Sequence, residues 1–335
     1  MIGSEMVVDM QHHYIPAEAL QHVGKTREYD FSVTLQRFRK AYQVMTDIEA
    51  DLRYMDEAGI DAAILSTGSF VSNGYEFCRV CNTGYGKVVR NYPERFRGMI
   101  HIDPLDDAAR NTDEIRRSVN ELGLFGLALV SSYGEITLDD PVLDPLYESA
   151  VRFDMPIFVH PTIRTDLWGG NRYDMYTTIS REYDILKSFV ELLHGVLPRF
   201  PDLKIVMAHL GGGFPTIKGR MLAWHQPTHI EIPQDYRRHG LSIRQAEELG
   251  LVADFESKCK NVLFDSAGIG GWSPVIRAAF ETLGADHLCF GTDYPYELAQ
   301  APYARKVLTD IDGLTIDDVD KRKFLSGNLR RMFRF

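Results

Sequence analysis

Histidine and aspartate side chains follow short apolar runs at four widely separated points of the chain. The first run leads into the segment Asp9-Met10-Gln11-His12-His13, and three later runs are followed by His160, His209 and Asp293. Imidazole and carboxylate groups are common ligands of zinc and manganese, and both also transfer protons. These points are therefore candidates for one divalent-metal site, provided that the fold brings them together.

Two side chains of the first segment are expected to face that site. Residues two apart on a strand point to the same side, so Gln11 and His13 would face it while His12 points away. A single histidine is more often an ordinary core or surface residue than a ligand. The metal hypothesis therefore depends on the joint placement of these groups at the ends of strands.

The elements between these points alternate apolar runs with helical stretches. Asp47 or Thr46 suits the N-cap of a helix over residues 46–52, and Gly59 ends it. Further helices are expected over residues 114–122, 145–152, 185–197 and 274–283. The eight expected strands are residues 7–9, 62–66, 96–101, 126–130, 157–160, 204–208, 262–265 and 288–291.

The pattern of the strands predicts an α/β fold of the (β/α)8, TIM-barrel type. Continuous apolar runs indicate strands buried on both faces, hence a parallel sheet, and eight β/α units favour a closed barrel over an open doubly wound sheet. The carboxyl ends of the strands would then meet at one rim. Residues 21–46, 163–184 and 226–251 are expected to be inserted helical and loop segments, and residues 1–335 to form a single domain.

Composition excludes several classes of function. Lys and Arg number 37 and Asp and Glu 47, a net charge of −10, which argues against a nucleic-acid or anionic-membrane partner. No run approaches the ~20 apolar residues of a membrane span, and the first residues lack a basic stretch followed by an apolar one. The cytoplasm is the expected compartment.

A Cys-x-x-Cys pair, Cys78 and Cys81, could be half of a zinc site or a redox pair. Two further ligands at short range are missing, because Cys259 and Cys289 are distant in sequence. The surrounding residues suit a helix, in which positions three apart share a face. We therefore expect two ordinary helical cysteines.

Several motifs together resemble the amidohydrolase superfamily, in the branch typified by aminocarboxymuconate-semialdehyde decarboxylase. Weaker matches, such as Met55-Asp56-Glu57-Ala58-Gly59-Ile60 and Tyr92-Pro93-Glu94-Arg95-Phe96, spread the resemblance over most of the chain. The main motifs are Asp9-x-Gln11-x-His13-x-x-Pro16, Val159-His160-Pro161, Ala208-His209-Leu210-Gly211-Gly212-Gly213-Phe214-Pro215 and Gly291-Thr292-Asp293-Tyr294-Pro295.

The resemblance implies a barrel with one divalent metal ion, zinc first and manganese second. By position, His13, His160 and Asp293 would be ligands, with His209 as the acid/base group. Arg220 matches a family arginine that binds a substrate carboxylate, sometimes across a dimer interface, so a homodimer or higher homo-oligomer is expected. An exposed helix position is the alternative for Arg220.

The chain departs from the family pattern at two places. Gln11 stands where the family has His or Glu, and a neutral amide oxygen binds zinc more weakly, so Gln11 would be a weak ligand or a partner of a bound water. The family's second substrate arginine is replaced near Tyr42. This second departure concerns the identity of the substrate.

Three functions are compatible with these residues. The first is non-oxidative decarboxylation of a small aromatic or unsaturated carboxylic acid, with His209 or Asp293 moving the proton. The second is hydrolysis of a lactone, amide or C–C bond at the same site. The third is a binding protein whose site has decayed at Gln11. In the segment 163–184, Trp168 could stack on a flat substrate acid, beside the positive charges of Arg164, Arg172 and Arg181. A solvent-exposed loop without a binding role is the alternative interpretation of this segment.

Overall fold

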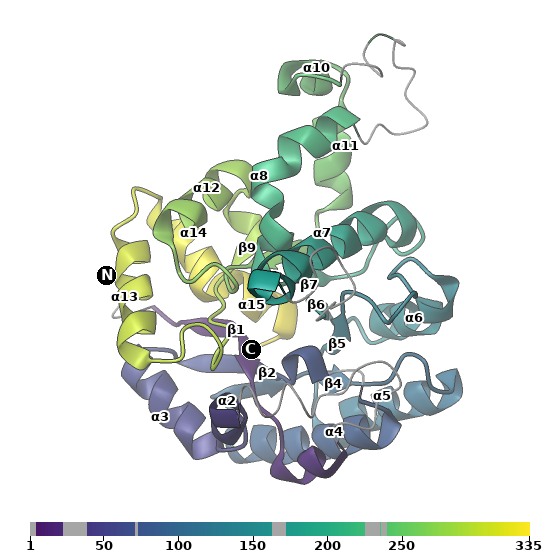
Figure 1. The fold of residues 1–335 in the computed structure, drawn as a ribbon, viewed down its shortest axis with the longest axis vertical. Coiled ribbons are helices and arrows are strands. Elements are labelled where there is room, and N and C mark those ends of the chain that lie inside the picture. The colour runs from purple at the N-terminus through teal and green to yellow at the C-terminus, as the bar shows by residue number, and fades with distance from the viewer. Residues whose placement is uncertain (1–4, 23–38, 71–72, 163–171, 225–234, 236–239) are drawn as a thin grey trace.

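The structure, a computed structural model, describes residues 5–22, 39–70, 73–162, 172–224, 235 and 240–335. Helices surround a set of parallel strands (Figure 1). The strands are β1 (Val8–His13), β2 (Ala62–Ser66), β3 (Phe96–Gly98), β4 (Ile100–His101), β5 (Leu127–Val130), β6 (Ile157–His160), β7 (Ile205–Met207), β8 (Val262–Asp265) and β9 (Leu288–Cys289). The α-helices are α2 (Arg39–Val44), α3 (Ile48–Ala58), α4 (Tyr75–Asn91), α5 (Ala108–Leu122), α6 (Asp144–Arg152), α7 (Arg181–Glu191), α8 (His209–Trp224), α10 (Ile243–Glu248), α11 (Leu251–Lys258), α12 (Ser273–Leu283), α13 (Ala301–Asp312), α14 (Asp318–Arg322) and α15 (Asn328–Phe333).

The strands close into the expected barrel. The parallel order is β1-β2-β3 and β4-β5-β6-β7-β8-β9, and only Met99 separates β3 from β4, so residues 96–101 act as one strand. The last strand joins the first through backbone bonds from Met10 N to Phe290 O and from His13 N to Tyr294 O, both 2.9 Å. Eight strands in one ring confirm the (β/α)8 prediction.

Burial explains the continuous apolar runs of the sequence. Every residue of β1, β2 and β5–β8 is buried, as expected when side chains of one face fill the barrel and those of the other contact helices. In β1 this burial includes polar residues from Asp9 to His13. Buried polar groups need partners, so this strand points to the functional centre.

Helix ends follow the local chemistry of the sequence. Asp47 Oδ1 accepts hydrogen bonds from Glu49 N and Ala50 N, both at 3.1 Å, and α3 ends at Gly59 with φ 83°. Both features were predicted. Cys78 and Cys81 lie buried in α4, and burial raises the pKa of both thiols, as suits ordinary helical cysteines.

Two helices that follow neighbouring strands hold the site from outside the barrel. The rings of Phe189 on α7, Phe214 on α8 and Phe264 on β8 pack together, with centroids 4.8–5.3 Å apart. Beyond this cluster α8 leads away from the barrel, and α10 and α11 project beside it (Figure 1). The phenylalanine cluster thereby packs α7 and α8 against each other and against β8.

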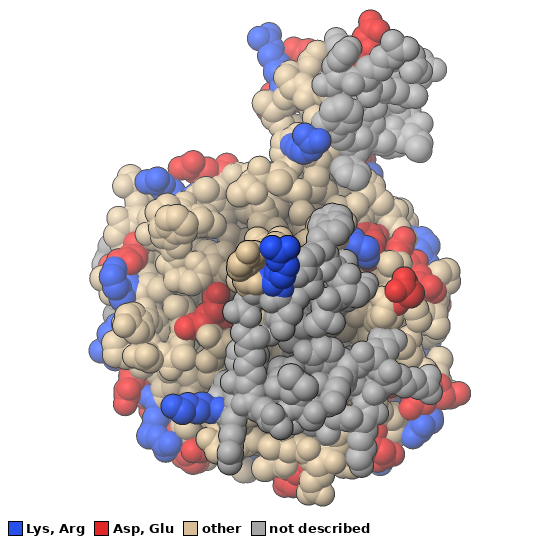
Figure 2. Space-filling model, viewed as in Figure 1, with Lys and Arg blue, Asp and Glu red and all other residues tan. Residues whose placement is uncertain are grey.

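The described surface carries both signs of charge. Basic and acidic side chains are interspersed around the rim of the face seen in Figure 2. Among the described helices, none combines the length and the apolar character needed to cross a membrane.

Candidate metal centre

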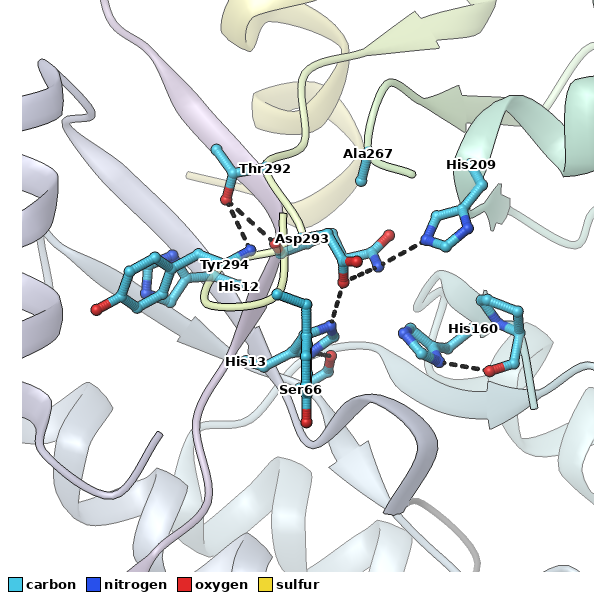
Figure 3. A network of polar contacts seen from close by, with 12 residues as sticks. His12, His13, Ser66, His160, His209, Ala267, Thr292, Asp293 and Tyr294 are labelled. Atoms are coloured by element: carbon cyan, nitrogen blue, oxygen red, sulfur yellow. Dashed lines mark hydrogen bonds and ion pairs between the residues drawn. The ribbon is translucent and has the colours of Figure 1, made fainter. Parts of the chain in front are cut away.

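Three predicted ligands meet at one end of the barrel. His13 ends β1, His160 ends β6 and Asp293 follows β9. One ligand atom from each residue lies within 4.8 Å of the others, and all three side chains are buried (Figure 3). His13 Nε2 and Asp293 Oδ1 are 2.9 Å apart. The structure thus brings together side chains that are 280 residues apart in sequence.

The surroundings of His160 fit a metal ligand. Its Nδ1–H donates to the carbonyl oxygen of Pro161 at 2.9 Å, which leaves Nε2 with its lone pair. Nε2 is buried and has no hydrogen-bond partner among the described residues. Burial lowers the pKa of His160 well below its usual value, and the nearby charges of His13 and Arg181 act in the same direction. A neutral imidazole with an unused lone pair is what a divalent ion requires.

The other two ligands are also held in place. Ser66 Oγ lies 3.2 Å from His13 Nδ1 and fixes that ring. Burial alone would raise the pKa of Asp293, but the hydrogen bond and charge of His13, with the charges of His209 and Arg181, hold it below its usual range. An ionised carboxylate beside two imidazoles is a donor set suited to zinc or manganese. The residues therefore fit the predicted ion.

The loop that carries Asp293 is tied to β1. Thr292 donates to Asp9 from its backbone nitrogen at 2.9 Å and from Oγ1 at 2.6 Å. Asp9 in turn contacts His12 Nδ1 at 3.0 Å. Burial would lower the pKa of His12, but Asp51 and Asp9 outweigh burial and raise it to about 9. His12 therefore points away from the triad, as expected from its position between Gln11 and His13, and contacts Asp9, which holds the loop of Asp293.

Gln11 connects two of the predicted groups. Its Nε2 donates to Asp293 Oδ1 at 2.8 Å and lies 3.2 Å from His209 Nε2. Its Oε1 is buried without a partner among the described residues. The expectation that Gln11 and His13 share a side of β1 is thus met.

His209 follows β7 and lies beside the triad. Its Nδ1 is 2.7 Å from Glu182 Oε1 at the start of α7, and its backbone nitrogen donates to Asp265 Oδ1 at 2.9 Å. Burial would lower the pKa of His209, but the charge and hydrogen bond of Glu182 outweigh burial and raise it to about 8. The ring therefore suits a proton donor at neutral pH.

Two residues of this centre were not anticipated. Glu182 lies inside the expected insertion 163–184, and no spacing rule of the sequence pairs it with His209. Asp265 did leave a signal, because it is an acidic residue at the carboxyl end of an expected strand.

The predicted substrate-binding residues have different outcomes. Arg220 is exposed on α8, in the regular part of the helix that follows the left-handed residues 209–213. Trp168 lies outside the described residues. Arg181 begins α7, and its Nε is buried without a hydrogen-bond partner among the described residues.

The sequence is similar to those of several named decarboxylases. Gamma-resorcylate decarboxylase of Polaromonas sp. is 24% identical over 302 residues, which cover 84% of this chain and 86% of that protein. The 2-amino-3-carboxymuconate-6-semialdehyde decarboxylase of Dictyostelium discoideum is 28% identical over 275 residues, covering 78% of this chain and 70% of that protein.

The fold also matches a solved structure. A 5-carboxyvanillate decarboxylase of Novosphingobium aromaticivorans, crystallised with manganese and 4-hydroxy-3-methoxy-5-nitrobenzoic acid, superimposes with a TM-score of 0.78 at 21% identity, covering 99% of this chain and 97% of that one. The sequence model of the amidohydrolase family matches residues 8–335. With the buried His13, His160 and Asp293 at the rim of a closed barrel, this match shows that the chain belongs to the amidohydrolase family.

Proposed function

We propose that the chain is a metal-dependent carboxy-lyase that removes carbon dioxide from a small aromatic or unsaturated carboxylic acid. One observation carries the proposal: Nε2 of His160, which has no hydrogen-bond partner among the described residues, lies in a buried triad, and Gln11 joins His209 to that triad. The named decarboxylases among the relatives support the same reaction class.

His13, His160 and Asp293 would hold one divalent ion, with Gln11 as a weak fourth ligand or as a partner of a bound water. A donor set with two imidazoles favours zinc, and the manganese bound to the related carboxyvanillate decarboxylase supports manganese as the alternative. The ion would supply positive charge that binds a substrate oxygen and stabilises negative charge developing in the reaction.

The reaction requires one proton for each carbon dioxide released. The bond between the carboxylate carbon and its neighbour breaks, its electron pair stays on the neighbouring carbon, and a proton fills that position. His209, with a pKa of about 8, carries a proton at neutral pH. Asp293, whose pKa is held low, is better suited to binding positive charge than to donating a proton. We therefore assign the proton donation to His209.

Arg181 is the candidate anchor for the substrate carboxylate within one chain. Its positive charge acts on His160, His209 and Asp293, and its buried Nε–H has no acceptor among the residues that the structure describes. Arg220 would serve the site of a second copy, because it lies on the helix that leads away from its own barrel. A homodimer or higher homo-oligomer in the cytoplasm, with Trp168 against the substrate ring, completes the proposal.

The test is elemental analysis of the purified protein followed by a carbon dioxide release assay on a panel of hydroxybenzoic and unsaturated acids. We expect one zinc or manganese ion per chain and release from at least one acid. His209→Ala should lower turnover by a factor on the order of 10² to 10⁴ while keeping the metal. Turnover of lactones or amides without carbon dioxide release would instead assign a hydrolase, and loss of metal in His209→Ala would make His209 a ligand.

A further inference from the structure

We propose that Glu182 is a positioning residue that keeps a proton on Nδ1 of His209 and thereby aims Nε2 of that ring at the substrate. The distance from Glu182 Oε1 to His209 Nδ1 is 2.7 Å, and Nε2 on the opposite side of the ring faces Gln11 at 3.2 Å. The role rests on the proposed function, because the orientation of this ring matters for catalysis only if His209 donates the proton. No motif singled out in the sequence contains Glu182.

The backbone around His209 is shaped to allow this contact. Residues 210–213 all have positive φ, from 50° to 79°, and turn the chain tightly between β7 and the regular part of α8. A Cβ on Gly212 would overlap the carbonyl oxygen of Glu182 itself. Gly212 therefore lets the turn that carries His209 lie directly on the first turn of α7. Few other residues tolerate both the positive φ and this close approach.

The ring of His209 is confined on its remaining sides. A Cβ on Gly268 would overlap the ring, so the loop after β8 lies against its face. The backbone nitrogen of His209 is held by Asp265, which also accepts from Ala267 N at 3.1 Å. With the backbone and one ring face fixed, the bond to Glu182 determines which nitrogen carries the proton. The hydrogen bond at Nδ1 thus sets the protonation and the orientation of the other ring nitrogen, Nε2.

Glu182 has little else to bind. Its only ion pair within the described ranges is with His209, and its side chain is 28% exposed. By contrast, Glu191 at the other end of α7 pairs with Lys187 and accepts from Leu138 N, which ties the helix to the loop after β5. α7 is therefore anchored by Glu191 and the Phe189 ring without help from Glu182. The contact of the Glu182 carboxylate with His209 is therefore not needed to hold α7 in place.

The experiment compares Glu182→Ala and Glu182→Gln with the wild type, with Glu191→Gln as the same-helix control. Glu182→Ala should lower kcat by at least about tenfold, within the loss expected for His209→Ala, while KM and metal content stay unchanged. Glu182→Gln keeps an acceptor oxygen and should restore part of kcat. Glu191→Gln should lose thermal stability but keep kcat. Wild-type kcat in Glu182→Ala, or a loss confined to KM, would overturn the proposal.

A second measurement does not depend on activity. In protein with ¹⁵N-labelled histidine, held at a pH above the pKa of His209 so that the ring is neutral, the nitrogen shifts of His209 should report a proton on Nδ1 in the wild type and in Glu182→Gln. The shifts are assigned by their loss in His209→Ala. Glu182→Ala should show a mixture of the two tautomers. If no acid is decarboxylated but these spectra differ as stated, the proposed function fails, while the control of the His209 tautomer by Glu182 stands. Identical spectra in wild type and Glu182→Ala would refute the positioning role alone.

Discussion

The side-chain amide of Gln11 donates from Nε2 to Oδ1 of Asp293 at 2.8 Å, so the residue that departs from the family pattern is bonded to a predicted metal ligand. Its Oε1 has no partner among the described residues. An uncharged amide binds a divalent ion more weakly than a carboxylate or an imidazole. Gln11→Glu and Gln11→His should therefore tighten metal binding, measured by chelator competition.

His13→Ala and Asp293→Ala should abolish metal binding in the same assay. Gln21→Glu, which adds the same charge at an exposed position, is the matched control and should leave the affinity unchanged. If the wild type carries no metal and Gln11→His gains none, the metal hypothesis is wrong, and a metal-free mechanism built on His209 and Asp293 would replace it.

Arg181 provides a test of substrate recognition. A charge-assisted hydrogen bond to a carboxylate contributes about 1.5–3 kcal/mol, so Arg181→Ala should raise KM about 10- to 100-fold with metal content unchanged. Arg181→Lys should restore only part of this loss, because a point charge does not reproduce the planar guanidinium contact. Steady-state kinetics on the best acid of the panel give the measurement.

Two further arginine variants serve as a control and as a test of a second subunit in that experiment. Arg277→Ala removes an exposed arginine from α12 and should have no effect on KM. Arg220→Ala should raise KM only if a second copy contributes Arg220 to the site, which light scattering of the same samples will show as an oligomer. Unchanged KM in Arg181→Ala would exclude Arg181 as the carboxylate anchor.

The triad was predictable from sequence because barrel geometry converts strand order into proximity. His13, His160 and Asp293 each stand at the end of an apolar run, and the carboxyl ends of parallel strands share a rim. The alternation of side chains along β1 likewise separated Gln11 and His13 from His12. Asp265 stood in the same kind of position and could have been included.

The contact between Glu182 and His209 was beyond sequence reasoning. It depends on how α7 packs on α8 and on a run of left-handed residues that brings Gly212 onto the α7 backbone. Neither the crossing of two helices nor the choice of left-handed φ at five consecutive positions, residues 209–213, follows from periodicity. The exposed position of Arg220 on α8 is also a tertiary feature.

Asp265 makes stability depend on pH. Burial, opposed by the charge and backbone bond of His209, raises the pKa of its carboxyl from 3.8 to about 7 in the folded protein. Because the folded protein binds this proton more tightly than the unfolded chain does, Asp265 contributes most to the free energy of unfolding below pH 3.8. This contribution is lost as the pH rises toward 7. Asp265→Asn keeps an oxygen for His209 N and Ala267 N but cannot ionise.

The unfolding free energy of Asp265→Asn relative to wild type should therefore increase between pH 4 and pH 7 and level off above pH 7. Urea unfolding of chelator-treated protein across this range measures the difference, because a bound cation would lower the pKa of nearby carboxyls. For Asp202→Asn, at an exposed position, the free energy of unfolding should follow the same pH dependence as that of the wild type. A parallel curve for Asp265→Asn would contradict the buried, protonated carboxyl.

Substitutions at two neighbouring glycines in the turn after His209 distinguish the effect of backbone strain from that of steric contact. Gly212 and Gly213 have φ of 68° and 79°, so alanine at either position has the cost of a left-handed residue, about 1–2 kcal/mol. A Cβ on Gly213 meets only Thr216 Oγ1 at 3.9 Å, whereas a Cβ on Gly212 overlaps the Glu182 carbonyl and crowds Leu186 N. Gly212→Ala must therefore also push α7 away from α8.

We expect Gly212→Ala to lower the free energy of unfolding clearly more than Gly213→Ala does. Gly212→Ala should also reduce kcat as Glu182→Ala does, while Gly213→Ala retains kcat. Equal losses of stability in the two variants would show that the turn does not press on α7.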